Sequence, residues 1–129
     1  MAAICVLIVD DDDLVRAVLR QLILQWNPSA TVVEAHNGHV ALAAYSDNDT
    51  DLIITDAYLP LMDGVALARA VRARNPAIPI ILISGTAAME DAAHEAGAMY
   101  YLNKRSLVAQ LPQILADLPI ADVAHRWCS

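Results

Sequence analysis

"ICVLIVDDDD", residues 4–13, joins six apolar residues directly to four aspartates. The unbroken apolar run is rich in β-branched residues, which predicts a strand over residues 4–9 that is buried on both faces. The four aspartates follow at the point where this strand ends. They could cap the next helix, hold a metal ion or simply face water, and the rest of the chain decides between these interpretations.

Apolar runs and stretches of helical period alternate along the remainder of the chain. The pattern predicts strands over residues 4–9, 31–35, 52–55, 78–83 and 99–102, and helices over residues 14–26, 38–45, 65–74, 87–96 and 111–118. Because Pro112 would break a helix begun at Leu107, we expect a short turn over 106–110 and the last helix from about Leu111. Five strands, each followed by a helix, predict an α/β fold with a parallel sheet covered on both faces.

Length and composition narrow the class of protein. A chain of 129 residues fits one domain, which we expect over residues 1–118, with a short C-terminal tail over 119–129. The longest apolar run, residues 1–9, is far shorter than the ~18 residues of a membrane span and lacks the basic start of a signal peptide. Cys5 and Cys128 do not resemble a disulfide framework, so we expect a cytoplasmic protein without a membrane partner. The net charge of −7 and the absence of a basic run argue against nucleic-acid binding by this chain alone.

Polar side chains follow the predicted strands where the strands end. Asp10 and Asp11 follow the first strand, Asp56 the third, Ser84 the fourth and Lys104 the fifth. In open parallel sheets the carboxyl ends meet at one edge, where ligands bind. Carboxylates held close together repel unless a cation joins them, and oxygen ligands favour Mg²⁺. A lysine and a hydroxyl beside them are suited to phosphoryl oxygens, so the sequence predicts a site of phosphoryl transfer.

Four segments in this order and spacing resemble the receiver domains of bacterial two-component response regulators. They are Val9-Asp10-Asp11, residues 56–64 (DAYLPLMDG), residues 81–85 (ILISG), and residues 96–98 (AGA) leading to 101–104 (YLNK). The resemblance covers about residues 3–118. It implies a flavodoxin-like, doubly wound, five-stranded parallel sheet of strand order 2-1-3-4-5 with helices on both faces. It also implies a cytoplasmic signalling phosphoprotein rather than an enzyme, because a receiver catalyses only its own phosphorylation and dephosphorylation.

The resemblance also implies a role for each residue at the strand ends. Asp56 would accept the phosphoryl group from a phosphohistidine of a sensor histidine kinase or phosphotransfer protein. Asp10 and Asp11, with Asp56 and the backbone carbonyl of Tyr58, would hold Mg²⁺. Lys104 would contact Asp56 and then the phosphoryl group.

The same resemblance implies how phosphorylation is transmitted. Ser84 would move towards the phosphoryl group and Tyr101 would turn inward behind it. The output surface would then consist of residues 87–96, 99–102 and 111–118, which would bind a downstream protein or a second copy of the chain in a homodimer.

Two features modify these expectations. Arg105 follows Lys104 where the family usually has proline, so we expect a trans peptide bond there, with Lys104 still reaching the pocket on its flexible stem. Tyr58 and Thr86 would border the path of the water that removes the phosphoryl group. A phenol ring fills that space and a threonine is too short to orient the water, so we expect a long-lived phosphorylated state.

Two other functions compete with this interpretation. Residues 10–15 (DDDDLV) also resemble the opening motif of haloacid-dehalogenase-type phosphatases, which would make Asp10 the nucleophile and Asp12 the general acid, but would leave Asp56 unexplained. The chain could instead keep the receiver fold only as a protein-binding module that is never phosphorylated. In the receiver interpretation, Asp12 and Asp13 begin the first helix, where its dipole favours negative charge.

Overall fold

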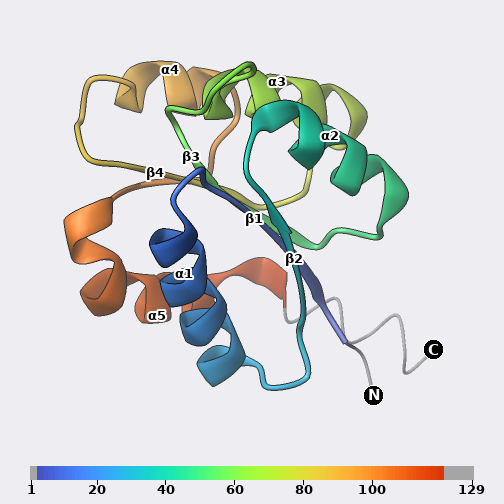
Figure 1. Cartoon of the computed structure of the whole chain (residues 1–129), viewed down its shortest axis with the longest axis vertical. Coiled ribbons are helices and arrows are strands. Elements are labelled where there is room, and N and C mark those ends of the chain that lie inside the picture. Colours follow the sequence, from blue (N-terminus) through green and yellow to red (C-terminus); the bar gives the residue numbers. More distant parts are fainter. Residues whose placement is uncertain (1–2, 121–129) are drawn as a thin grey trace.

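The structure is a computed structural model that describes residues 3–120 (Figure 1). Strands and helices alternate along these residues. In chain order the elements are β1 (Cys5–Val9), α1 (Asp13–Trp26), β2 (Thr31–Ala35), α2 (Gly38–Asp47), β3 (Leu52–Asp56), α3 (Gly64–Arg74), β4 (Ile80–Ser84), α4 (Glu90–Glu95), β5 (Tyr100–Asn103), the 3₁₀ helix η1 (Lys104–Ser106) and α5 (Leu107–Asp117). No helix within this range combines the length and the apolar character that a membrane span requires.

The five strands form one parallel sheet of order β2-β1-β3-β4-β5, which confirms the predicted fold. The chain runs from β1 outwards to β2 and then returns to β3 on the other side of β1. The winding direction therefore switches between β1 and β3, and in sheets of this kind ligands bind at the carboxyl ends of the strands at that switch. Every residue of β3 and β4 is buried, as expected for strands covered on both faces.

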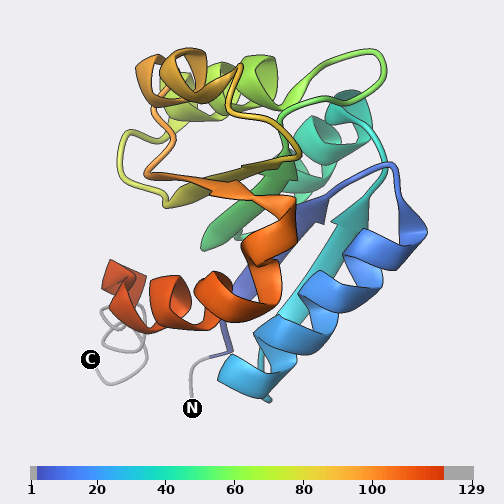
Figure 2. The same cartoon turned by 90° about the vertical axis from the view of Figure 1, so that its left-hand side faces the viewer.

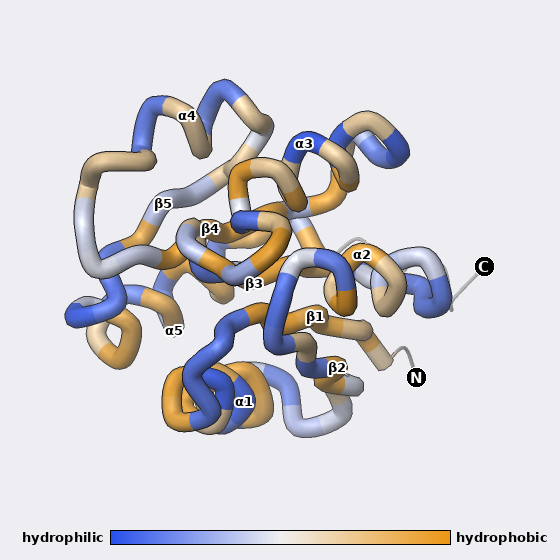
Figure 3. Tube along the Cα trace, turned by 45° about the horizontal axis from the view of Figure 1, so that its top comes forward, coloured by the Kyte–Doolittle hydropathy of each residue, from blue (hydrophilic) through white to orange (hydrophobic). Residues whose placement is uncertain are grey.

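Two helical layers cover the sheet, with α1 and α5 on one face and α2, α3 and α4 on the other (Figures 1 and 2). Successive strand residues alternate between the two layers. Val6 and Ile8 pack in the cluster that includes α1 and α5, whereas Leu7 and Val9 pack in the cluster that includes α2, α3 and α4. Figure 3 shows the hydrophobic β1 and β3 enclosed between helices that carry hydrophilic residues along their length.

Helix α1 begins as the sequence predicts. Asp12 is its N-cap, and the Asp12 Oδ1 accepts a hydrogen bond of 2.9 Å from the backbone N–H of Leu14. This bond satisfies one of the amide donors that a helix leaves free at its start. Asp13 follows in the first turn, so two of the four aspartates serve the helix.

The expected start of the last helix at Leu111 is wrong, because α5 begins at Leu107 and contains Pro112. Leu107, Leu111 and Leu115 are spaced four residues apart and are all buried. Leu111 and Leu115 would lie in the helix with either start, so the burial of Leu107 distinguishes the two; it stabilises the fold by about 1.5–3 kcal/mol and offsets much of the ~3 kcal/mol cost of a proline inside a helix. Pro112 lies on the exposed side, and the carbonyl that lacks a donor belongs to Val108, whose side chain is also exposed.

Helix α4 is shorter than the predicted residues 87–96. The Thr86 hydroxyl accepts a hydrogen bond of 3.1 Å from the N–H of Ala88, and the N–H of Glu90 donates to the carbonyl of Ala87. These contacts form turns before Glu90, because a threonine side chain can take a backbone donor that a helix would otherwise use. The loop after β4 is therefore longer than expected, and it reaches the functional edge of the sheet.

Of the expected tail over 119–129, the structure describes residues 119 and 120, which follow α5. Leu118 and Ile120 are both buried against the α1 and α5 side of the core. Residues 121–129, which include Cys128, lie outside the described residues, and Cys5 carries a free thiol.

Candidate functional site

The carboxyl ends of β1, β3, β4 and β5 meet at one edge of the sheet, as the sequence predicts. The strand pairing places Val9 beside Thr55, Asp56 beside Ile83 and Ser84 beside Asn103. The residues that follow each strand are therefore neighbours in space. Asp10 and Asp56 take adjacent positions at the switch between β1 and β3, and Lys104 begins the η1 helix directly after β5.

Three carboxylates form an acidic cluster at this edge. Asp10, Asp11 and Asp56 each contribute an oxygen atom, and these atoms lie within 4.8 Å of one another. Asp10 is fully buried and Asp56 nearly so, whereas Asp11 is exposed. An all-oxygen set that is open on one side suits a hard cation such as Mg²⁺, which keeps several of its waters. The residues present therefore fit the magnesium ion that the sequence analysis predicts.

Lys104 neutralises the buried part of this cluster. Its Nζ donates a hydrogen bond of 2.7 Å to Asp56 Oδ2 and lies 3.0 Å from Asp10 Oδ2, an ion-pair distance whose angles fall short of a hydrogen bond. Burial acts to lower the pKa of Lys104, but the hydrogen bond to Asp56 and the negative charges of Asp10 and Asp56 outweigh it and raise that pKa above its usual value. Lys104 therefore stays a cation in the pocket.

The peptide bond before Arg105 is trans, as predicted, since residues 3–120 contain no cis bond. The chain turns into η1 at this point, where the Asn103 side chain accepts a hydrogen bond of 2.9 Å from the N–H of Arg105. This cap replaces the conformational restriction that a proline would supply at position 105. The geometry leaves Lys104 directed into the pocket although proline is absent.

Asp10 has an environment unlike that of the exposed aspartates. Burial raises the pKa of its carboxyl above the usual value, and the charge of Asp56 acts in the same direction. The N–H of Asp12, which donates 2.9 Å to Asp10 Oδ1, and the ammonium of Lys104 oppose this rise. Because burial makes the ionised carboxylate less stable, a nearby cation stabilises Asp10 more than it would stabilise a carboxylate in water.

Asp56 is positioned by contacts to both of its carboxylate oxygens. Oδ1 accepts a hydrogen bond of 3.0 Å from the N–H of Tyr58, while Oδ2 accepts from Lys104. The backbone of Asp56 is also closely packed, because a Cβ added at Gly64 would lie only 2.0 Å from the Asp56 carbonyl oxygen. Only glycine lets the start of α3 approach β3 this closely.

Ser84 and Tyr101 both contact the loop that follows β4. Ser84 is fully buried, and its Oγ accepts a hydrogen bond of 3.2 Å from the N–H of Thr86. The Tyr101 hydroxyl donates a hydrogen bond of 2.7 Å to the backbone carbonyl of Thr86. Thr86 is therefore tied to both residues, and the described hydrogen bonds include none between Ser84 and Asp56.

Tyr58 and Leu61 lie in the loop between β3 and α3, which begins directly after Asp56. Their side chains are 47% and 80% exposed, and Leu61 has a positive φ of 70°. A leucine in the left-handed region is uncommon and stores local strain, which the surrounding loop must hold. Tyr58 leaves this loop towards solvent, and Thr86, on the other side of the edge, is exposed too.

Arg16 is not among the residues to which the sequence pattern points, yet it contacts the same loop. Its Nη1 donates a hydrogen bond of 2.5 Å to the backbone carbonyl of Asp10, and its Nε donates 3.0 Å to Glu34 Oε1. Two signals in the sequence were available. Arg16 follows Asp13 at the i,i+3 spacing of a helical ion pair, and Glu34 lies near the end of the strand that pairs with β1.

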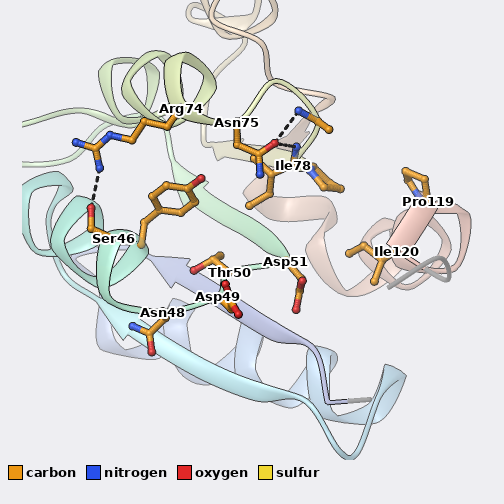
Figure 4. A pocket seen from close by; sticks show the side chains of 13 residues that line it. Ser46, Asn48, Asp49, Thr50, Asp51, Arg74, Asn75, Ile78, Pro119 and Ile120 are labelled. Atoms are coloured by element: carbon orange, nitrogen blue, oxygen red, sulfur yellow. Dashed lines mark hydrogen bonds between the residues drawn. The ribbon is translucent and has the colours of Figure 1, made fainter. Parts of the chain in front are cut away.

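A cavity of about 780 Å³ lies at the opposite edge of the sheet, where β3 and β4 begin (Figure 4). Its walls come from the last turns of α2 and α3, from the loops that lead into β3 and β4, and from residues just after α5; they include Tyr45, Asp49, Arg74, Pro79 and Ile120. None of the acidic cluster lines it. The cavity is therefore separate from the chemistry at the carboxyl edge.

The chain is similar in sequence to known proteins. The family model described as "Response regulator receiver domain" matches residues 6–116. The transcriptional regulatory protein ZraR of Salmonella typhimurium is 37% identical over 93% of this chain and 30% of its own length. The transcriptional regulatory protein PrrA of Mycobacterium tuberculosis is 37% identical over 82% of this chain and 46% of its own length. The chain thus spans less than half of these two relatives.

Solved structures agree with the fold. The signal receiver domain of the putative response regulator NarL from Mycobacterium tuberculosis is 29% identical, with a TM-score of 0.79 over 91% of this chain and 96% of that one. A putative response regulator from Chloroflexus aurantiacus is 32% identical, with a TM-score of 0.74 over 89% of this chain and 99% of that one.

Proposed function

This chain belongs to the response regulator receiver domain family, and from that premise we propose that it is switched by phosphorylation of Asp56. The donor is a phosphohistidine on a sensor histidine kinase or phosphotransfer protein, and the switched surface binds a downstream protein. The observation that carries the proposal is the pairing of a nearly buried Asp56 with Lys104 at 2.7 Å, inside a cluster of three carboxylates. A structural ion pair would not need the exposed Asp11 beside it.

The chain's own residues account for each requirement of the transfer. A carboxylate oxygen of Asp56 attacks phosphorus, so that a phosphorus–oxygen bond forms while the phosphorus–nitrogen bond to the imidazole breaks. The imidazole leaves with the electron pair of that bond. Lys104 already hydrogen-bonds Asp56 Oδ2, so its ammonium is within reach of the phosphoryl oxygens and offsets their charge.

Asp10, Asp11 and Asp56, with the backbone carbonyl of Tyr58, are the residues that would hold Mg²⁺. When bound, the ion supplies positive charge to the transferring phosphoryl group. Asp10 supports this assignment. Burial raises the pKa of its carboxyl and so disfavours the ionised form, which a bound cation would stabilise. Without a cation, phosphorylation would add negative charge to a pocket that already contains three carboxylates and one lysine.

The switch is proposed to run through Ser84, Thr86 and Tyr101. A phosphoryl group on Asp56 would offer new acceptor oxygens, towards which the buried Ser84 hydroxyl can turn. Ser84 Oγ now accepts from the N–H of Thr86, and the Thr86 carbonyl accepts from Tyr101, so a change at Ser84 is passed to β5. A small displacement becomes a switch when the packed face has two arrangements and phosphorylation favours one.

The proposed output face consists of α4, β5 and α5. Val108 on α5 and Met99, which directly precedes β5, have side chains 69% and 41% exposed and offer apolar area for a protein partner or a second copy of the chain. The face includes Tyr101, one of the switch residues. It lies at the β5 edge of the sheet, opposite the β2 edge. The proposed activity is confined to the chain's own phosphorylation and dephosphorylation, so the protein is a signalling module rather than an enzyme.

The geometry gives less support to a phosphatase of the haloacid-dehalogenase type. That mechanism needs Asp12 to transfer a proton beside Asp10, but the Asp12 side chain is occupied in capping α1. A receiver fold that is never phosphorylated would have no need to hold the partly buried Lys104 between two carboxylates. The arrangement favours Asp56 as the phosphoacceptor over both alternatives.

The test is intact-mass measurement after incubation with acetyl phosphate and Mg²⁺. The wild-type chain should gain the mass of one phosphoryl group, and the gain should disappear when the metal is chelated. Asp56→Asn is the matched control, because it keeps the size and the hydrogen bond to the N–H of Tyr58 but removes the nucleophile. A gain that persists in Asp56→Asn or in chelator would contradict the proposal.

A further inference from the structure

Arg16 makes three contacts with three different segments of the chain. Its Nη1 donates a hydrogen bond of 2.5 Å to the backbone carbonyl of Asp10, which directly follows β1. Its Nε donates 3.0 Å to Glu34 Oε1 on β2, and its Nη2 pairs with Asp13 Oδ1 in the first turn of α1. The side chain is only 15% exposed although it begins at a surface helix. Because Nε, Nη1 and Nη2 of Arg16 each have an acceptor, the guanidinium is fixed in position and links the three segments.

The loop that Arg16 braces presents both N-terminal carboxylates of the acidic cluster. Asp10 and Asp11 must converge with Asp56 to within ligand distance, although like charges at that separation repel. Hydrogen bonds inside the loop, such as the N–H of Asp12 to Asp10 Oδ1, shape the loop but do not anchor it to the rest of the fold. The N–H of Asp10 donates to the carbonyl of Ala35 at the end of β2. Arg16 adds a second link, from the Asp10 carbonyl to Glu34 on the same strand.

Glu34 fixes Arg16 in turn. The Glu34 carboxylate accepts hydrogen bonds from Arg16 and also from Arg20, one turn further along α1. The hydrogen bond from Arg20, together with that from Arg16, lowers the pKa of Glu34, so the carboxylate remains ionised at neutral pH. Arg20 contacts Glu34 and the Val32 carbonyl but none of the residues 10–13. The two arginines thus share a partner and differ in their contact with the loop.

We infer that Arg16 is a positioning residue of the metal site, one that sets Mg²⁺ affinity by holding the Asp10 carbonyl and thereby the ligands on that loop. The inference rests on the proposed function, because it takes Asp10 and Asp11 as metal ligands. Residues that orient metal ligands typically change affinity by about 10–100-fold when they are replaced.

Two effects of Arg16 oppose each other, and the choice of variant must separate them. The positive charge of the guanidinium repels a bound cation and weakens binding. Its hydrogen bonds hold the ligands of the loop in place and strengthen binding. Replacing Arg16 with alanine would remove both effects together. Arg16→Lys keeps the charge but replaces a planar fork with a single ammonium that cannot reach all three acceptors, so it isolates the geometric effect. Arg20→Lys is the matched control, since it makes the same chemical change on the same helix against the same Glu34.

The experiment is a Mg²⁺ titration of the metal-free, full-length chain, followed by backbone amide shifts or calorimetry. We expect Arg16→Lys to weaken Mg²⁺ binding about tenfold, and Arg20→Lys to bind as wild type does. Unchanged affinity in Arg16→Lys, or equal loss in both variants, would overturn the inference. Failure of the wild type to bind Mg²⁺ would instead contradict the proposed function.

Glu34→Gln tests the same link by changing the residue on β2 to which Arg16 is bound. The variant leaves Arg16 in place but weakens its anchor on β2, and it makes no change in the loop itself. Mg²⁺ affinity should fall by a smaller factor than in Arg16→Lys. Affinity equal to that of the wild type would show that the anchor to β2 has no part in the metal site, even if Arg16→Lys proves unable to fold.

Discussion

Gly64→Ala should damage the site more than it damages the fold. A Cβ at this position would lie 2.0 Å from the carbonyl oxygen of Asp56 and 2.9 Å from its carbonyl carbon. Ordinary contacts of a Cβ begin at 3.4 Å, so the start of α3 and the end of β3 must separate by at least the difference, about 1.4 Å. Both obstacles are backbone atoms, which cannot rotate away as a side chain would.

Two magnitudes follow from that displacement. Overpacking of this kind destabilises a fold by about 1–3 kcal/mol, which a domain of this size can survive. A displacement of about 1 Å in a reacting group can cost about 100-fold in rate, because the attacking oxygen loses its alignment. The expected result is a folded variant with a phosphorylation rate reduced about 100-fold.

Gly85→Ala is the matched control. It makes the same change in the loop after β4, where no atom lies within 4 Å of the added Cβ and the backbone is outside the left-handed region. Its stability should be unchanged or raised by up to about 1 kcal/mol, because alanine restricts the unfolded chain. The assays are urea unfolding and the rate of mass gain with acetyl phosphate. Wild-type phosphorylation in Gly64→Ala, or equal destabilisation in both variants, would refute the reasoning.

Three further predictions concern stability, pH and the lifetime of the signal. Pro112→Ala should raise the unfolding free energy by about 1–2 kcal/mol in urea titrations, because it restores a donor for the Val108 carbonyl, less the flexibility gained by the unfolded chain; no gain would contradict this. Because the folded-state pKa of Glu34 is lowered, wild type should be more stable than Glu34→Gln above the unfolded pKa near 4.5, and this advantage should vanish as pH falls through the lower folded value. A difference that persists under strongly acidic conditions would count against the ion pair. Tyr58→Asn should speed loss of the phosphoryl group several-fold by orienting the attacking water, without changing the rate of phosphorylation; an unchanged or slower loss would show that Tyr58 is not the gate.

The strands and the acidic cluster could be predicted from the sequence because both depend on local pattern and on topology alone. Residues 4–9 read as a buried strand, and the carboxyl ends of parallel strands meet at one edge whatever the loops do. The convergence of Asp10, Asp56 and Lys104 can therefore be predicted without knowing where their side chains point. The trans bond before Arg105 also followed from elementary energetics, because a cis bond to a residue other than proline costs about 3–4 kcal/mol.

Where the sequence pattern led to a wrong expectation, tertiary packing was the deciding force. Pro112 indicates a helix start by local rules, yet α5 extends back to Leu107, whose side chain is buried one turn before the buried Leu111. Arg16 went unnoticed because its role depends on where its side chain points across two other segments. Such contacts are set by the packing of α1 on the sheet, which local patterns do not specify.

The identity of the phosphorylated aspartate decides the central claim. Asp56 and Asp10 both lie in the pocket, and the competing phosphatase mechanism would place the phosphoryl group on Asp10. Treating the phosphorylated chain with borohydride converts an aspartyl phosphate to homoserine, which peptide mass spectrometry then locates. This assay reads the site directly and does not depend on a variant that could alter the pocket.

Homoserine should appear at position 56, and aspartate should remain unchanged at positions 10 and 11, only in samples that contained both acetyl phosphate and Mg²⁺. Homoserine at position 10 would contradict the account, since it would make Asp10 the nucleophile and leave the hydrogen bond between Asp56 and Lys104 without the role assigned to it.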